Sequence, residues 1–276
     1  MFNFYLDMNN TSSLENVLSI VKPDMIIHLA SISSAQYAFK HPIETLYSNG
    51  MITANLCEII HRKGWKTKLF NASSVEIYKG HIDYLVNEED LTHTYNLHPY
   101  SIAKIMGQSM VDFYRTTYQL PFSNGILFTT ESKYKRPEFL LNKMGKHIRE
   151  WKQGYKTELR VGNLDSYRNI VHASDVAGAI HQILNQEKGD SYLICGDESY
   201  KMIDLVFRLY SLAGIDLIQE ENVLFEKETG LKVVIMEYTP VGLDSTPINI
   251  RGEPKKLKEI GWNPLFSVED ILDELV

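Results

Sequence analysis

Short apolar runs of strand length alternate along most of the chain with longer stretches whose apolar residues recur at helical spacing. Strands are predicted at residues 1–6, 24–30, 67–72, 122–128 and 192–195. Helices are predicted at residues 14–21, 43–63 and 99–117, then around Lys143 and from about Asp175. Because strands that alternate with helices pair in parallel, this order predicts an α/β fold on a doubly wound sheet.

The pattern changes beyond residue 129. A basic, irregular segment at 133–137 is followed by helices that alternate with short strands up to the C-terminus. We expect this part to form a smaller α/β domain that covers the cleft at the sheet edge. The predicted division is residues 1–160 for the sheet domain and 161–276 mainly for the smaller domain, with some chain crossing back to the sheet.

Composition narrows the class of protein. Of 276 residues, 44% are hydrophobic and 23% are charged, which is typical of a globular protein. The net charge of -7 argues against a nucleic-acid or anionic-membrane partner, and no apolar run approaches the ~20 residues of a membrane span. The two cysteines lie in apolar contexts without metal-ligand spacing, so we expect buried, reduced thiols and a cytoplasmic location.

Candidate chemistry lies between Ser74 and Lys104. Tyr100 and Lys104 are four apart and share one helix face, where the ammonium favours the phenolate and lets Tyr100 act as acid or base near neutral pH. Ser74 ends a strand-like run, and Glu76 follows it. The alternative is a tyrosine and a lysine that merely share a solvated face, although none of the other 15 tyrosines has a lysine at this offset.

Several runs resemble a known family: they are Asn71–Tyr78, His98–Lys104, Asn124–Phe128 with Glu131–Ser132, Gly162–Arg168, and Lys256–Pro264. Together they resemble the extended short-chain dehydrogenase/reductases and, within them, the GDP-mannose 4,6-dehydratase family. The resemblance implies a Rossmann-like, dinucleotide-binding first domain and a substrate-binding second domain. It also implies a homodimer or higher oligomer formed through helices 44–63 and 98–117.

The resemblance implies the following roles at the candidate site. In the family NADP takes a hydride from the sugar C4, a carboxylate removes the C5 proton, water leaves from C6, and the hydride returns to C6. Tyr100 would be the base at the C4 hydroxyl, and Ser74 would hydrogen-bond the C4 oxygen. Lys104 would tune Tyr100 and hold the nicotinamide ribose, and Glu76 would take the C5 proton.

Four further residues match binding positions of the family. Lys143 and Arg168 match basic positions that hold the nucleotide diphosphate, and Asn124 falls in the substrate cleft. Asp7 matches the residue that reads the adenine ring. The alternatives are ordinary surface charge for Lys143 and Arg168 and a helix-capping role for Asp7.

The chain departs from the family pattern at its start. The family begins with a strand and a Gly-x-x-Gly-x-x-Gly turn that holds the pyrophosphate, whereas no glycine precedes Gly50. Three explanations are open: an incomplete reading of a longer gene, a second polypeptide that supplies the missing segment, or a strand at 1–6 that moves beside 24–30. Two smaller departures from the family pattern follow Ser74. Val75 stands where the family has a hydroxyl or an acid, and Lys79 stands where glycine is usual.

Three functions follow from these features. The first is an NADP-dependent nucleotide-sugar 4,6-dehydratase acting on GDP-mannose. The second is a degenerate member of the family that binds nucleotide sugar or serves in assembly without catalysis. The third is a sugar-nucleotide reductase or epimerase, in which Glu76 has no role in elimination.

Overall fold

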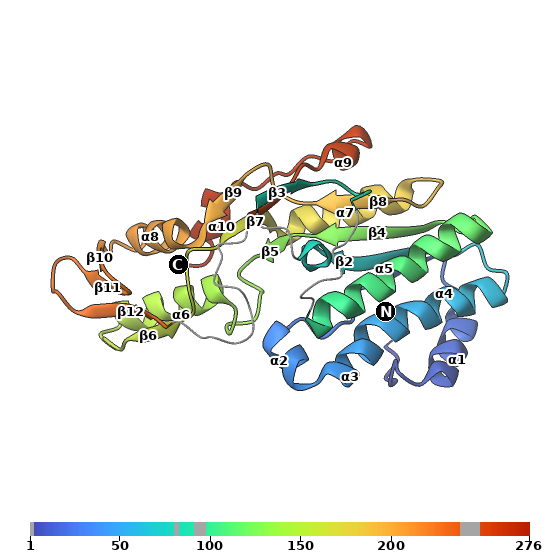
Figure 1. The fold of residues 1–276 in the computed structure, drawn as a ribbon, viewed down its shortest axis with the longest axis horizontal. Helices are drawn as coiled ribbons and strands as arrows, with labels where there is room; N and C mark the ends of the chain where they lie inside the picture. The colour runs from blue at the N-terminus through green and yellow to red at the C-terminus, as the bar shows by residue number, and fades with distance from the viewer. Residues whose placement is uncertain (1–2, 80–82, 91–97, 238–248) are drawn as a thin grey trace.

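The computed structural model describes residues 3–79, 83–90, 98–237 and 249–276. Its central sheet has four strands in the order β1-β2-β4-β8, and all of its pairings are parallel. These strands are β1 (Met25–His28), β2 (Lys68–Ser74), β4 (Phe122–Leu127) and β8 (Ser191–Ile194). The predicted α/β class with a parallel sheet is therefore confirmed (Figure 1).

Helices cover both faces of the central sheet (Figure 1). Successive residues of a strand point to opposite faces, so Leu69 packs with one helix layer and Phe70 with the other. The first layer consists of α1 (Thr11–Val21), α4 (Ile52–Arg62) and α5 (Pro99–Tyr118), and the second of α7 (Ala173–Asn185) and α9 (Lys255–Glu259). Gly125 is needed in β4, because a Cβ there would lie 2.3 Å from the Phe70 ring.

The structure differs from the predicted strands at the start of the chain, both at residues 3–6 and at the edge strand β1. Residues 3–6 form no strand, and the first two residues of the predicted strand lie outside the described residues. Leu6 instead lies in a loop, where its side chain packs against the helix layer of α1, α4 and α5 rather than in a sheet. Within the described chain β1 pairs with β2 alone, and Met25 and Ile27 are 47% and 51% exposed rather than buried.

A second lobe lies at the other end of the molecule (Figure 1). Its core combines α6, α8 and α10 with a sheet of order β10-β11-β12-β6. The bounds are α6 (Leu140–Lys152), α8 (Met202–Leu212), α10 (Val268–Asp273), β10 (Leu217–Glu220), β11 (Val223–Glu226), β12 (Lys232–Met236) and β6 (Leu159–Val161). Trp151 is buried in this core and donates its indole N–H to Glu226 over 3.0 Å. Thus α6 packs with the second lobe, whereas α7 and β8 return to the central sheet.

Short elements connect the two lobes (Figure 1). Two small sheets have the orders β5-β7-β9 and β13-β3. Their strands are β5 (Thr129–Glu131), β7 (Tyr167–His172), β9 (Ser199–Lys201), β13 (Asn249–Gly252) and β3 (Asp83–Val86). The remaining helical segments are α2 (Ala35–Lys40), α3 (Pro42–Thr45), a π-helical turn at Leu46–Met51 and a 3-10 turn at Val75–Tyr78. In the described segments, none of these helices has the length and apolar character needed to cross a bilayer.

Candidate functional site

The four predicted catalytic residues meet where β2 ends. Ser74 is the last residue of β2, and Glu76 lies in the 3-10 turn that follows it. Tyr100 and Lys104 lie on the first turns of α5, which packs against β2. The Ser74 hydroxyl accepts the Glu76 backbone N–H over 3.3 Å, and Ser74 lies close enough to Tyr100 to have a lowering effect on the pKa of its phenol. The structure therefore brings together the serine, the phenol, the ammonium and the carboxylate.

The Tyr100–Lys104 pair does not behave as the sequence predicts. The Lys104 Nζ lies 5.7 Å from the centre of the Tyr100 ring and donates to the Ala72 carbonyl over 2.8 Å. Burial raises the pKa of Tyr100 to about 12, against the lowering effect of the Ser74 hydrogen bond. Burial also lowers the pKa of Lys104 to about 8. The expectation that Lys104 brings the pKa of Tyr100 near neutrality is thus wrong, because burial dominates both groups.

The carboxylate of Glu76 is held by two neighbours. Its Oε2 lies 3.0 Å from the His98 Nε2 and 3.3 Å from the Lys79 Nζ. The His98 Nδ1 accepts the Ser101 backbone N–H over 3.3 Å, so the Nε2 carries the proton and donates it to Glu76. Burial would raise the pKa of Glu76, but the His98 hydrogen bond and the Lys79 charge outweigh it and lower this pKa to about 2.

A small cavity adjoins this carboxylate. The Glu76 cavity has a volume of about 70 Å³ and is lined by Val75, Glu76, Lys79, Phe128, Thr129, Tyr167, Arg168, Asn169 and Ile250. Arg168 reaches it from β7 and donates one guanidinium N–H to the Tyr167 carbonyl over 2.8 Å. Of the predicted substrate-binding residues, Arg168 is therefore the one that the structure places beside Glu76 within the described chain.

The other predicted binding residues lie elsewhere. Asn124 is fully buried, accepts from the Asn71 side chain over 2.9 Å and donates to Asp112 over 2.8 Å. These bonds tie β2, β4 and α5 together, so its amide serves the core, and we do not propose a substrate role for it. Lys143 donates to the Arg160 carbonyl over 2.8 Å and links α6 to β6. Asp7 is exposed in a turn, where its carboxylate accepts from Asn9.

Sequence reasoning missed the partners of Glu76. His98 precedes the proline at the first position of α5 and accepts a backbone N–H there, so it occupies the N-cap. That position could have been found from the His98-Pro99 pair. Lys79 was noticed only as a departure from glycine, and its contact with Glu76 depends on the shape of the 3-10 turn between them.

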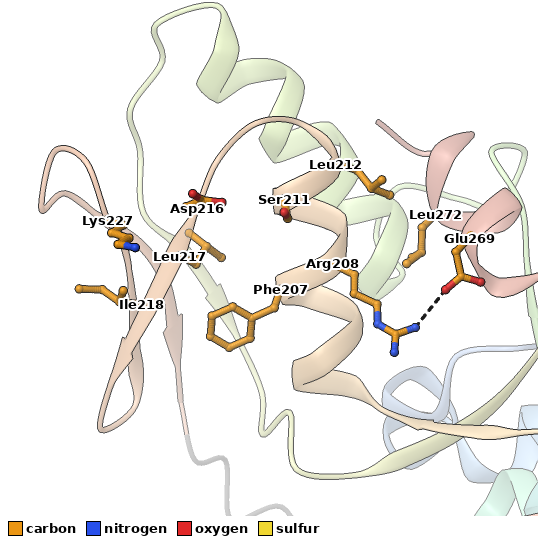
Figure 2. Close-up of a pocket in the computed structure, with 10 residues that line it drawn as sticks. All are labelled: Phe207, Arg208, Ser211, Leu212, Asp216, Leu217, Ile218, Lys227, Glu269 and Leu272. Carbon is orange, nitrogen blue, oxygen red and sulfur yellow. Dashed lines mark hydrogen bonds and ion pairs between the residues drawn. The ribbon is translucent and has the colours of Figure 1, made fainter.

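A hollow larger than the Glu76 cavity lies in the second lobe (Figure 2). It has a volume of about 710 Å³ between α8, the β10–β11 hairpin and α10. An ion pair between Arg208 and Glu269, at 3.1 Å, borders it, and Phe207 and Leu272 contribute apolar surface. Sequence reasoning did not single out this hollow. The four predicted catalytic residues all lie at the end of β2, so the candidate site remains there.

Comparisons with known proteins agree with this geometry. The family described as "GDP-mannose 4,6 dehydratase" matches residues 1–275. The chain belongs to the GDP-mannose 4,6-dehydratase family. Two relatives illustrate the relationship at the level of sequence. "GDP-mannose 4,6 dehydratase 2" of Caenorhabditis elegans is 28% identical over 99% of this chain and 72% of its own length, and "GDP-mannose 4,6-dehydratase" of Vibrio cholerae is 28% identical over 99% and 77%.

Solved structures share the fold. RMD from Pseudomonas aeruginosa, solved in complex with NADPH, superimposes with a TM-score of 0.82 at 21% identity, covering 99% of this chain and 86% of RMD. DesIV, a dTDP-glucose 4,6-dehydratase from Streptomyces venezuelae, superimposes with a TM-score of 0.79 at 20% identity, covering 98% and 77%. At these identities the likeness establishes the extended short-chain dehydrogenase/reductase fold.

Proposed function

We propose that this member of the GDP-mannose 4,6-dehydratase family is a nucleotide-sugar 4,6-dehydratase that acts on GDP-mannose. The observation that carries the proposal is the meeting of Ser74, Glu76 and Tyr100 at the end of β2. A carboxylate beside a serine–tyrosine pair provides a base for a carbon acid next to groups that bind a carbonyl oxygen. Family membership supports the choice of substrate.

Each residue of the site has a defined task in this proposal. Tyr100 accepts the proton of the C4 hydroxyl as a phenolate, so the positive charge of the bound nicotinamide would have to offset the burial that raises its pKa. Ser74 hydrogen-bonds the same oxygen. Glu76 accepts the C5 proton once C4 is a ketone, because the ketone acidifies the neighbouring C–H bond. Arg168, which lines the Glu76 cavity, contributes positive charge for the diphosphate of the substrate.

NADP is the proposed cofactor, and it would supply hydride transfer from C4 and back to C6. Tyr100 and Lys104 fit its nicotinamide end, because Lys104 keeps N–H donors beyond the one bonded to Ala72. RMD and DesIV were solved with NADPH and with NAD respectively, which supports a nicotinamide cofactor. For Asp7 we keep the proposed adenine contact, since its carboxylate is exposed in a turn.

The pyrophosphate end of NADP lacks an evident holder. No glycine precedes Gly50, and the described residues next to β1 form no glycine-rich turn. Among the described residues β1 pairs on one side only, and its other edge, with Met25 and Ile27 half exposed, is where a further parallel strand could pair. We therefore include in the proposal a polypeptide segment that pairs with this edge and holds the pyrophosphate.

The decisive experiment is incubation of the purified protein, alone and joined to a segment that supplies the glycine-rich turn, with NADP and GDP-mannose, followed by mass spectrometry. We expect a product that has lost one water and carries a 4-keto group. Glu76→Gln should abolish the product, whereas Glu228→Gln, at an exposed turn of the second lobe, should not. If the protein binds both ligands and yields no dehydrated product, the proposal is wrong.

A second candidate function is that of a sugar-nucleotide reductase or epimerase. The observation that favours it is the pKa of Glu76, which His98 and Lys79 lower to about 2 and which weakens this carboxylate as a base. A product that keeps its C6 oxygen would support this alternative. Binding of GDP-mannose without turnover would instead support a non-catalytic binding or assembly protein.

We also propose a cytoplasmic homodimer. Cys57 and Cys195 are buried free thiols, as suits a reducing compartment. The surface of α5 exposes Phe113 and Tyr118 by 46% and 43%, which provides apolar area for a second copy. Light scattering of the wild type and of Phe113→Glu should give a dimer and a monomer respectively.

A further inference from the structure

Lys79 is placed in the Glu76 cavity without a role in the functions proposed so far. It follows the 3-10 turn directly and brings its Nζ to 3.3 Å from the Glu76 Oε2. Only 15% of its side chain is exposed, against 36% for Glu76. A nearly buried ammonium thus lies beside the carboxylate, within the cavity that both groups line.

The elimination of water needs an acid as well as a base, because hydroxide is a poor leaving group. Val75, the neighbour of Ser74 on the cavity wall, has no proton to give. The Ser74 hydroxyl accepts the Glu76 N–H and is assigned to the C4 oxygen in the proposed function. Neither of these two residues is therefore assigned as the acid that protonates the leaving hydroxyl.

The other polar groups of the cavity are less suited to it. Arg168 carries a guanidinium that does not give up its proton in proteins. The His98 Nε2–H points at Glu76 Oε2, and the opposite ring nitrogen is occupied by the Ser101 N–H. Tyr167 and Thr129 also line the cavity, and their hydroxyls are the remaining competitors. Lys79 differs from Arg168 because it can both lose and regain a proton, and it differs from His98 because it lines the cavity itself.

We propose that Lys79 is the general acid that protonates the departing C6 hydroxyl, an inference that rests on the proposed dehydratase function. The C5–H bond breaks and its proton goes to the carboxylate of Glu76, while the electron pair forms the C5=C6 double bond. The C6–O bond breaks, and its oxygen takes a proton from the Lys79 Nζ and leaves as water. The proton on Glu76 then passes to the neutral Lys79 amine across the ion pair, which restores both groups.

The pairing explains how a strongly held carboxylate can act as a base. While Lys79 is charged it stabilises ionised Glu76, so the base is in its correct form before the reaction. When Lys79 releases its proton to the leaving hydroxyl, that stabilising charge disappears and Glu76 becomes more basic. The charges near Lys79 during this exchange are Glu76 itself and Arg168, and the other titratable groups of the site are His98 and Tyr167.

Lys79→Arg separates charge from proton transfer, because arginine keeps the cation but cannot release a proton. The reaction is run in D₂O with NADP and GDP-mannose, and both water loss and deuterium at C5 of recovered sugar are measured. We expect water loss to fall by at least about 100-fold while deuterium still enters C5. The matched control is Lys156→Arg, a lysine that pairs with Glu226 in the second lobe and should leave both rates unchanged.

Lys79→Gly gives a second readout that does not depend on how arginine fits. A small primary amine such as ethylamine, added to this variant, should restore water loss in proportion to its concentration.

Two outcomes overturn the proposal. In the first, Lys79→Arg eliminates water as fast as the wild type. In the second, Lys79→Arg loses both deuterium exchange and water loss, and the amine restores no water loss in Lys79→Gly. A Tyr167→Phe variant that loses elimination but keeps exchange would assign the role to Tyr167 instead. If the wild type itself releases no water, the proposed function fails, which distinguishes that outcome from failure of the Lys79 assignment alone.

Discussion

Glu76 accepts a hydrogen bond from His98 over 3.0 Å, while the other ring nitrogen of His98 accepts the backbone N–H of Ser101. One imidazole thus caps the first turn of α5 and fixes the candidate base. Because α5 also carries Tyr100 and Lys104, the position of the carboxylate is tied to the helix that presents the phenol and the ammonium. This coupling links the local stability of α5 to the electrostatics of the site.

Substitutions of His98 should separate its role as the N-cap of α5 from its hydrogen bond to Glu76. His98→Asn keeps a side chain that caps helices well but removes the ring that reaches Glu76, so we expect the pKa of Glu76 to rise from about 2 toward its ordinary value. The measurement is a ¹³C NMR titration of the Glu76 carboxyl. His98→Ala should show the same rise and, in addition, lose about 1 kcal/mol of unfolding free energy with the cap. An unchanged pKa in both variants would contradict the assigned hydrogen bond.

Glu76 should contribute to stability in a defined pH window. Its pKa is lower in the folded protein than in the unfolded chain, so its contribution is fully present above about pH 4.5 and is lost as pH falls toward 2. Since about a third of the side chain is exposed and solvent screens the pair, we expect a loss of about 1 kcal/mol. Urea unfolding of the wild type and of Glu76→Gln between pH 5 and about pH 3 measures it. The wild type should lose more stability than the variant over this range.

Lys104 should affect the free energy of unfolding at alkaline pH. Burial lowers its pKa to about 8, below the value of an unfolded lysine, so the unfolded chain binds the extra proton above pH 8. The free energy of unfolding should therefore rise with pH from about 8 to about 10.5, by an amount on the order of 2 kcal/mol. Lys104→Met has no proton to lose and should lack this rise. If the free energy of unfolding changed with pH in the same way in both proteins, the lowered pKa of Lys104 would be contradicted.

Asn124 should matter for stability rather than for substrate. Its amide joins Asn71 and Asp112 in the core, so Asn124→Ala leaves buried polar groups without partners and should cost about 2–3 kcal/mol. Asn185→Ala, at an exposed position on α7, is the matched control and should cost far less. Urea unfolding gives both values. A loss of ligand affinity at unchanged stability in Asn124→Ala would return this residue to the binding site.

The sequence alone determined the type and order of most elements. The period of apolar residues identified β2, β4 and α5, because a buried strand or helix face needs the same spacing wherever it packs. It also determined that Ser74, Glu76, Tyr100 and Lys104 would meet, since a serine at the end of a parallel strand lies beside the first turns of a helix that packs on that strand.

Only the tertiary structure decided which groups these residues touch. The apolar residues after Met1 match a strand, but Leu6 packs on helices, and in the part of the chain that the structure describes β1 pairs with β2 alone. Asn124 matches a binding position, but its register with Asn71 turns its amide into the core. Periodicity is a local property, whereas burial, hydrogen-bond partners and pKa depend on segments far apart in the chain, as the pairing of Glu76 with His98 shows.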